Sequence, residues 1–342
     1  NYFVINIDCL KYSANPYNTK NLNKNKNYVF YKLDINNKNK ITKILKKYKP
    51  DAIFNLAAET HVDRSIDKPY NFIHSNILGT YNLLESILAC KKKIKLVHIS
   101  TDEVYGDVIN GYSTETSPTN PSNPYAASKA AADLLVQSYI RTHGLPAIIV
   151  RGSNNFGPFQ YPEKLIPLAI TNLLEEKPIP IHGDGLQVRS WLHVEDFCNA
   201  IDLVMHKAVD GSVFNVAGNH KQNIEVVKHI CEFLGKNYQD YSSHMNDRPG
   251  GDLRYAPKSL MIQRELGWKA KYPINKTRCC QISTKRNKWR CYFHHPKLWS
   301  LQSHERRGQN MEYEQGRKVI CKGRPRPKIY QDRKAIGLPD NI

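Results

Sequence analysis

Apolar side chains along this chain fall into short runs, separated by longer segments whose apolar positions have helical spacing. The runs are rich in branched and aromatic residues and end in small or polar ones, a pattern typical of strands in a parallel sheet. We predict strands at residues 2–7, 28–35, 51–58, 95–100, 147–151, 179–182 and 213–217. Helices are predicted at residues 71–88, 125–144 and 224–234, with another beginning at Pro162. The alternation predicts an α/β fold in which helices cover a parallel sheet.

Polar residues with catalytic chemistry follow the strand at residues 95–100. Thr101, Asp102 and Glu103 come directly after it, and the carboxyl edge of a parallel sheet is where open α/β folds bind ligands. Further on, Tyr125 and Lys129 stand four apart at the start of an alanine-rich helix, so both lie on one face. An ammonium group there favours ionisation of a phenol, which then moves a hydroxyl proton near neutral pH. Taken alone, this pair is more typical of a solvated helix surface than of a catalytic site.

The formal charge of +19 raises nucleic acid and membrane surfaces as partners, but its distribution argues against both. Residues 275–342 hold 17 Lys and Arg against 5 Asp and Glu, so the tail carries +12 of the total. We find no apolar run of membrane-spanning length and no signal peptide at the start, and therefore expect a cytoplasmic protein. The eight cysteines lack framework spacing and are expected to be reduced.

Several motifs together carry a family resemblance. They are the Ser-Thr-Asp-Glu strand end, Asn123 and Pro124 before Tyr125, and the segment Val-Arg-Gly-Ser-Asn-Asn-Phe-Gly-Pro at residues 150–158. With these motifs the chain resembles the extended short-chain dehydrogenases that act on nucleotide sugars, and among them the 4,6-dehydratases of dTDP-glucose. The likeness runs from the first residue to about Trp268.

The resemblance implies a Rossmann-like doubly wound parallel sheet with a smaller C-terminal substrate domain. It divides the chain into an NAD-binding part at residues 1–175, a substrate-binding part at 176–274 and an unrelated or disordered basic tail at 275–342. The chain has no glycine-rich turn about twenty residues before Asp8, where such a fold binds the pyrophosphate. We therefore expect that the sequence starts at the second strand, that the first is missing, and that this form binds NAD poorly and is nearly inactive.

The resemblance also assigns binding residues. The cofactor NAD is expected at Asp8, Asp34, Ile35, Leu56, Ala57, Ala58, Ser75, Tyr125 and Lys129. The nucleotide sugar is expected at Thr60, His61, Asn154, Lys164, Leu165, Arg189, Asn223 and Arg248. A lone histidine such as His61 is often structural, and a single arginine such as Arg189 equally forms surface ion pairs. The chain has Gly251 where the family pattern leads us to expect His, which leaves the nucleoside open.

The reaction implied is dehydration of a nucleoside-diphosphate glucose, with dTDP-glucose as the expected substrate. Tyr125, aided by Lys129, accepts the C4 hydroxyl proton as hydride passes to NAD, while Thr101 holds the C4 oxygen. Glu103 then removes the C5 proton, Asp102 protonates the departing C6 hydroxyl, and the hydride returns to C6. A plain pair of carboxylates at a helix start is the structural alternative for Asp102 and Glu103.

Two other functions stay open. A nucleotide-sugar epimerase or decarboxylase of the same superfamily needs no carboxylate pair, and a non-catalytic fragment whose basic tail binds nucleic acid would follow from charge alone. Zinc ligands could be imagined among Cys279, Cys280, Cys291, His294 and His295, but without the paired spacing of a zinc motif we expect no metal. A homodimer through helices at residues 71–88 and 130–139 is expected from the family.

Overall fold

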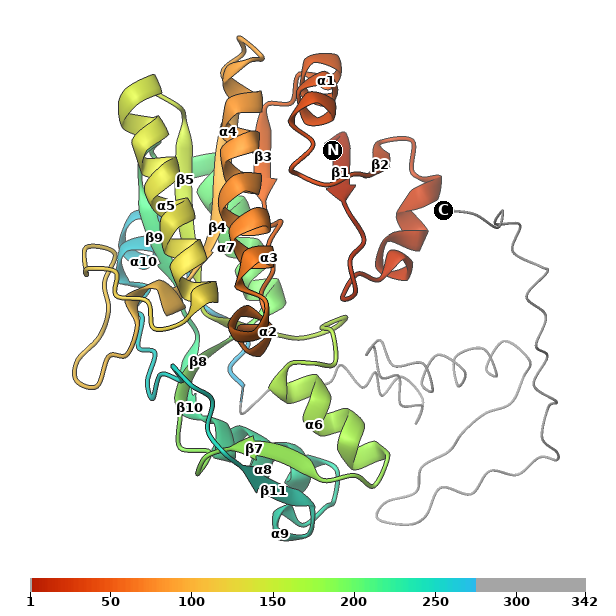
Figure 1. Cartoon of the computed structure of the whole chain (residues 1–342), viewed down its shortest axis with the longest axis vertical. Coiled ribbons are helices and arrows are strands. Elements are labelled where there is room, and N and C mark those ends of the chain that lie inside the picture. Colours follow the sequence, from red (N-terminus) through yellow and green to blue (C-terminus); the bar gives the residue numbers. More distant parts are fainter. Residues whose placement is uncertain (1, 275–342) are drawn as a thin grey trace, which may run out of the picture.

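Four parallel strands form the centre of the larger part of the molecule in the computed structural model, which describes residues 2–274 (Figure 1). The strands are hydrogen-bonded in the order β3 (Ala52–Asn55), β4 (Lys95–Thr101), β5 (Ala147–Gly152) and β9 (Val213–Val216). In the middle of this sheet Val97 lies opposite Phe54 on one side and Ile148 on the other. The parallel sheet predicted from the sequence is confirmed.

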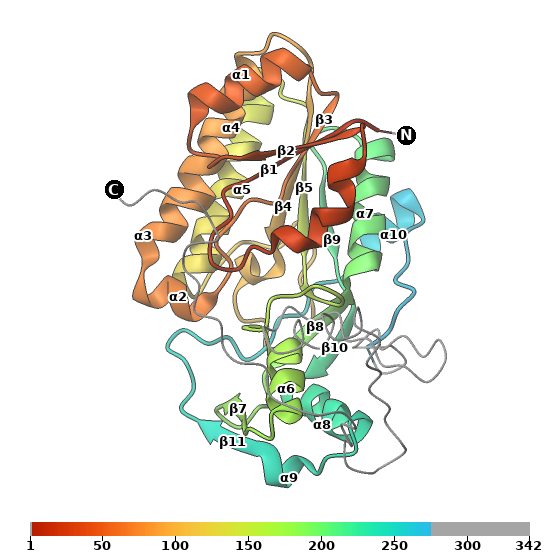
Figure 2. The same cartoon turned by 90° about the vertical axis from the view of Figure 1, so that its right-hand side faces the viewer.

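Helices cover both faces of the central sheet (Figure 2), and alternate residues of the two central strands pack against opposite layers. Leu96 and Ile149 pack against α1 (Lys38–Tyr48), α4 (Gly79–Leu88) and α5 (Pro124–His143). Val97 and Ile148 pack against α7 (Val194–Lys207) and α10 (Leu260–Leu266). All four side chains are fully buried, and each such burial stabilises the fold by about 1.5–3 kcal/mol. The central strands are therefore apolar on both faces.

The sheet is interrupted on its β3 side. The strands β1 (Val4–Asp8) and β2 (Tyr28–Lys32) pair in parallel with each other, and among the described residues they form a sheet separate from that of β3. They lie beside the four-stranded sheet, with a short 3-10 helix, η1 (Pro16–Lys24), between them in the chain (Figure 1). Among the described residues, the sheet that holds the predicted chemistry therefore ends at β3 on this side.

The helix predicted at residues 71–88 is divided by a π-helical segment. It begins within α3 (Pro69–Phe72), continues as η2 (Ile73–Leu78) and ends as α4, and the short helix α2 (Val62–Asp67) precedes it. Asn76 is buried within η2, where its side chain accepts a hydrogen bond from the Glu59 backbone N–H and donates to the Glu59 carbonyl and Ser128 Oγ. Wider turns of this kind recur near functional sites, where they re-aim side chains.

A smaller part of the molecule holds a mixed three-stranded sheet and a parallel pair. The three strands are ordered β10 (Asn219–Gln222), β8 (Val188–His193) and β6 (Asn154–Phe156), and the pair is β11 (Ser242–Met245) with β7 (Ile179–His182). Helices α6 (Leu165–Leu174), α8 (Asn223–Phe233) and α9 (Tyr238–Tyr241) pack around one apolar core with β7. The chain passes between the two parts more than once, so the boundary at residue 175 stays a prediction.

Several element boundaries differ from those predicted. The strands predicted at 28–35 and 51–58 end at Lys32 and Asn55, and the helix expected from Pro162 begins at Leu165. In the first case the Asp34 carboxylate accepts a hydrogen bond from the Asn36 backbone N–H at 2.8 Å, which turns the chain away from the sheet. Within residues 2–274 no helix is long and apolar enough to span a bilayer.

Candidate active site

The carboxyl end of β4 carries three polar side chains in a row. Thr101 ends the strand, and Asp102 and Glu103 open the short 3-10 helix η3 (Asp102–Tyr105). The Thr101 hydroxyl accepts a hydrogen bond from the Glu103 backbone N–H at 3.3 Å and donates one to Asp102 Oδ1 at 3.4 Å. This cap fixes both carboxylates at the edge of the sheet, as the sequence predicted.

Asp102 lies in an environment that disfavours its charge. The residue is 1% exposed, and its Oδ2 atom is buried with no hydrogen-bond partner among the described residues. Burial, and then the neighbouring Glu103, raises the pKa of Asp102 to about 8, with Arg189 opposing the shift. At neutral pH the carboxyl is therefore protonated and has a proton to donate.

Tyr125 and Lys129 lie one turn apart at the start of α5. The helix begins there because Pro124 suits the first turn and Asn123 caps it, accepting a hydrogen bond from the Ala126 backbone N–H at 2.9 Å. Both side chains are buried, and Lys129 Nζ donates a hydrogen bond to the Ile99 carbonyl at 2.5 Å. This bond ties the helix to β4 and places Tyr125 beside the strand end.

The pKa of Tyr125 moves in the direction opposite to the one expected. Burial, and then the charge of Glu103, raises the pKa of the phenol, while a hydrogen bond with Thr101 opposes the shift. Burial lowers the pKa of Lys129 to about 8, opposed by Asp133. The expected lowering of the Tyr125 pKa by Lys129 is not found, because burial and the charge of Glu103 dominate the shift.

A buried network below the site was not predicted from the sequence. Arg151, on β5, donates a hydrogen bond to Asp133 Oδ2 at 3.0 Å and another to the Tyr105 hydroxyl at 2.9 Å. The Tyr105 hydroxyl donates in turn to Asn215 Oδ1 at 2.7 Å. Asp133 lies one turn after Lys129 on α5, so the network joins α5 to β5, β9 and η3.

A second group that the sequence analysis missed lies next to Glu103. The Tyr255 hydroxyl is 3.2 Å from Glu103 Oε2 and 2.6 Å from Asp252 Oδ2. The guanidinium group of Arg189 lies over the Tyr255 ring, 4.2 Å from its centroid, and donates a hydrogen bond to the Asp252 carbonyl at 2.8 Å. Burial raises the pKa of Glu103, and the positive charges of Arg189 and Lys164 oppose this.

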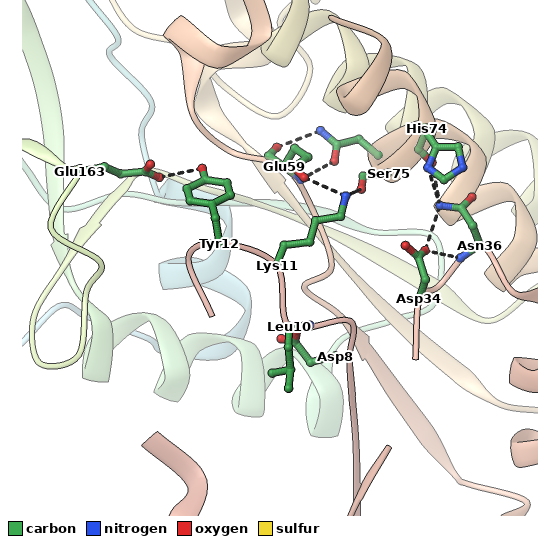
Figure 3. A network of polar contacts seen from close by, with 11 residues as sticks. Asp8, Leu10, Lys11, Tyr12, Asp34, Asn36, Glu59, His74, Ser75 and Glu163 are labelled. Atoms are coloured by element: carbon green, nitrogen blue, oxygen red, sulfur yellow. Dashed lines mark hydrogen bonds and ion pairs between the residues drawn. The ribbon is translucent and has the colours of Figure 1, made fainter. Parts of the chain in front are cut away.

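An open hollow of about 410 Å³ lies at the carboxyl ends of β1 and β2. It is lined by Cys9, Lys11, Lys32, Leu33 and Asp34. Figure 3 shows Asp34 on one side of this region and Asp8 at the end of β1. Carboxylates at the ends of such strands accept hydrogen bonds from ribose hydroxyls in dinucleotide-binding folds. Among residues 2–274 no glycine-rich turn leads into a helix beside these two carboxylates.

The other residues expected at the cofactor lie on neighbouring elements. Leu56, Ala57 and Ala58 follow β3, and Leu56 is 58% exposed. Ile35 packs against the core, while Ser75 lies on η2. Lys11 Nζ donates hydrogen bonds to Ser75 Oγ at 3.1 Å and to Glu59 Oε1 at 2.8 Å (Figure 3).

Four of the residues expected at the substrate lie close together and are called the rim below: Thr60, His61, Lys164 and Arg248. Lys164 Nζ donates a hydrogen bond to the Thr60 carbonyl at 2.9 Å, and charge interactions link His61 to both Lys164 and Arg248. Glu163, not predicted, completes the rim: it lies 4.0 Å from His61 Nε2 and accepts a hydrogen bond from the Tyr12 hydroxyl at 3.2 Å (Figure 3).

The remaining expected substrate residues are more dispersed. Arg189, on β8, faces Glu103 and Tyr255, and Asn154 pairs with Trp191 at the start of β6. Leu165 begins α6 and packs against the core of the smaller part. Asn223 begins α8, where its side-chain amide lies 3.5 Å from Gln187 Oε1. The structure does not bring Asn223 into contact with Asp102 or Glu103.

Comparison with known proteins places this chain in a family. A model of the family described as GDP-mannose 4,6 dehydratase matches residues 1–278. The dTDP-glucose 4,6-dehydratase of Haemophilus influenzae is 48% identical over 287 residues, which cover 78% of this chain and 85% of that protein. The enzyme of the same name from Neisseria meningitidis is 44% identical over 286 residues, 78% of this chain and 81% of the relative. The chain belongs to the dTDP-glucose 4,6-dehydratase family.

A solved dehydratase has the same fold. DesIV, a dTDP-glucose 4,6-dehydratase from Streptomyces venezuelae crystallised with NAD and TYD bound, superposes with a TM-score of 0.76 at 40% identity. The superposition covers 78% of this chain and 82% of DesIV. Both the family and the doubly wound fold expected from the sequence are confirmed. Most of the basic tail lies outside the matched residues, and the imagined zinc ligands lie outside the described ones.

Proposed function

We propose that this chain catalyses the NAD-dependent dehydration of dTDP-glucose to the 4-keto-6-deoxy sugar. The observation that carries the proposal is the protonated Asp102, with a buried, unpartnered Oδ2, beside Glu103 and Tyr125. Elimination of water needs one group that gives a proton and one that takes it, and neighbouring carboxyls in different environments supply both. An epimerase of the same fold has no use for this pair.

The roles follow from protonation and place. Asp102 gives its proton to the departing C6 hydroxyl, and Glu103, held nearer to positive charges, takes the C5 proton. Tyr125 takes the C4 hydroxyl proton, and Thr101 donates a hydrogen bond to the C4 oxygen. When bound, NAD supplies the hydride acceptor at C4 and donor at C6, together with a positively charged ring. Positive charge near Tyr125 lowers the pKa of the buried phenol.

Cofactor residues are proposed on the same basis. Asp8 and Asp34 beside the open hollow suit the adenosine ribose, with Ile35 against the adenine. Leu56, Ala57, Ala58 and Ser75 would line the middle of the cofactor, and Tyr125 with Lys129 its reactive end. The small alanine side chains let a ligand approach the backbone after β3.

The nucleotide sugar is proposed to lie between the two parts of the molecule. Arg189 and Arg248 suit paired phosphate oxygens, since a guanidinium fork matches them. Thr60, His61 and Lys164 would contact the sugar from the opposite rim. Asn154, Leu165 and Asn223 complete the expected set. Gly251 adds no polar side chain for the nucleoside.

We also propose a cytoplasmic homodimer that associates through α3, η2, α4 and α5. Apolar side chains on these helices are exposed at Tyr70, Ile73, Leu78 and Leu134, to between 43% and 68%. Their exposure on helices that cover one face of the sheet supports an interface there. Sedimentation of the chain with and without Leu134→Asp tests the assembly separately from catalysis.

The catalytic proposal is tested by incubating the chain with dTDP-glucose at NAD concentrations raised until the rate no longer changes. A 4-keto-6-deoxy product, which absorbs in alkali, is the expected result. Glu103→Gln is the matched control, because it keeps the size of the side chain and one acceptor oxygen but cannot take a proton. A product that changes only its configuration at C4 would favour the epimerase instead.

A further inference from the structure

The Tyr255 phenol, which is not among the expected catalytic residues, is buried between two carboxylates. The Tyr255 hydroxyl is 2.6 Å from Asp252 Oδ2 and 3.2 Å from Glu103 Oε2. Tyr255 and Asp252 are 4% and 3% exposed, so water does not compete for these contacts. Ser122 Oγ donates a hydrogen bond to the other Asp252 oxygen at 2.5 Å. The Tyr255 side chain is held in place by Arg189 over its ring.

A phenol has one proton, so it can donate to only one of the two carboxylates at a time. The shorter distance assigns that proton to Asp252, and the Tyr255 oxygen then presents lone pairs to Glu103. While Asp252 holds this proton, the Glu103 contact is favourable when Glu103 is protonated and donates to the Tyr255 oxygen. If Tyr255 donates to Glu103 instead, that hydrogen bond lowers the Glu103 pKa. The arrangement therefore offers a ready acceptor for the proton that a base at Glu103 acquires.

We propose that Asp252 is a positioning residue that acts on Glu103 through Tyr255, by holding the Tyr255 proton so that the phenol oxygen faces Glu103 as an acceptor. In the proposed reaction the C5–H bond breaks, its proton goes to Glu103 and its electron pair stays on the sugar. The new Glu103 hydroxyl donates to Tyr255, whose own proton stays directed at Asp252. When the proton returns to C5 the chain of contacts reverts, and no proton is gained or lost.

Several charged groups face Glu103 and affect its protonation. Arg189 on β8 and Lys164 before α6 favour the carboxylate, whereas burial and Asp252 favour the neutral acid. Asp102 precedes Glu103 on η3, and Tyr125 faces it from α5. Asp252 is the only one of these that shares a hydrogen-bonded phenol with Glu103 among the described residues. Its effect is therefore separable from simple charge.

The test is a pH titration of Glu103 by carbon-13 NMR in the full chain with labelled glutamate carboxyls. The Glu103 signal is identified by its loss in Glu103→Gln. The inference rests on the proposed function for the source of the proton. The titration itself needs neither cofactor nor turnover, so a negative result here is distinct from a failure of the proposed function. Asp252→Asn frees the Tyr255 proton to donate to Glu103, and should lower the Glu103 pKa by about one unit.

A double-mutant cycle shows whether the effect passes through Tyr255. Tyr255→Phe removes the acceptor of the Glu103 proton and should also lower the Glu103 pKa, and adding Asp252→Asn in that background should change it little further. If Asp252→Asn shifts the Glu103 pKa equally in the parent chain and in Tyr255→Phe, Asp252 acts on Glu103 only through its charge, and the proposal is overturned. So would the absence of any shift.

One further variant, Tyr105→Phe, serves as a control. Tyr105→Phe removes a hydroxyl from another buried, hydrogen-bonded tyrosine that does not contact Glu103, and should leave the Glu103 titration unchanged. If Asp252→Asn fails to fold by circular dichroism, Tyr255→Phe alone decides the outcome. An unchanged Glu103 pKa in that variant would refute the acceptor role of the phenol.

Discussion

Removal of one partner from the buried ion pair of Asp133 and Arg151 should strongly destabilise the protein. The two side chains are 3.0 Å apart, and both residues are at most 3% exposed. Arg151→Met leaves the Asp133 carboxylate without its main positive partner, while His98 lies 3.8 Å away and burial lowers its pKa well below the usual value. An uncompensated buried charge costs about 3–5 kcal/mol.

The same structure predicts a different result when both charges are removed. Arg151→Met with Asp133→Leu leaves Tyr105 free to donate to Asn215 as before, at 2.7 Å. Replacing a buried ion pair by apolar side chains of similar volume is often nearly neutral. The double variant should therefore be more stable than Arg151→Met alone, with a coupling energy of about 2 kcal/mol.

Urea denaturation monitored by circular dichroism and by tryptophan fluorescence measures these differences. Trp191 and Trp268 lie in the cores of the two parts of the molecule, so coincident transitions would support two-state analysis. If Arg151→Met lowers the free energy of unfolding by less than about 1 kcal/mol, the reasoning that each charge compensates the other in a buried pair is refuted. It is also refuted if the losses of the two single variants add in the double variant.

Four other predictions concern the site. The elimination rate should fall as pH rises through about 8, where Asp102 loses the proton it donates, and a profile that is flat across this range would contradict its assignment as the acid. Because the folded pKa of Asp102 lies above its unfolded value, the stability it contributes is complete at acid pH and is lost as pH rises toward 8; Asp102→Asn should remove that part of the dependence, as thermal melts at several pH values can check. Tyr125→Phe should slow oxidation at C4 by about 10²–10⁴-fold, whereas Glu103→Gln should keep reduction of NAD and lose elimination, so single-turnover absorbance of reduced cofactor should separate them. Calorimetric titration should find weak binding of NAD to this 342-residue chain, since among residues 2–274 no glycine-rich turn leads into a helix beside Asp8 and Asp34; micromolar affinity would contradict this.

Sequence patterns predicted the elements that local chemistry determines. The central strands are apolar on both faces, and Asn123, Pro124 and Gly144 mark the ends of the catalytic helix, so these elements follow from neighbouring residues. The same holds for the carboxylates after β4, because a strand end fixes where the next side chains lie. The π-helical turn at Asn76 escaped prediction, since it depends on Glu59 and Ser128, far away in sequence.

Contacts between distant segments explain what the sequence analysis missed. Tyr255 and Asp252 lie about 150 residues after Glu103, and nothing local marks them as its neighbours. The direction of the Tyr125 pKa shift depends on burial and on the neighbouring charge of Glu103, which come from the packing of distant segments. A spacing of four residues predicts that two side chains share a helix face. It does not predict which group from another segment forms a hydrogen bond with one of them.

The most direct test of the proposed function is the identity of the product that the chain forms from dTDP-glucose labelled with deuterium at C4. With NAD raised to saturation, proton NMR should show a 4-keto-6-deoxy sugar that carries the deuterium at C6, because hydride leaves C4 and returns to C6. Deuterium that returns to C4 with inverted configuration, or a 4-keto sugar that keeps its C6 hydroxyl, would contradict the assignment of Asp102 and Glu103 as the acid and base of an elimination.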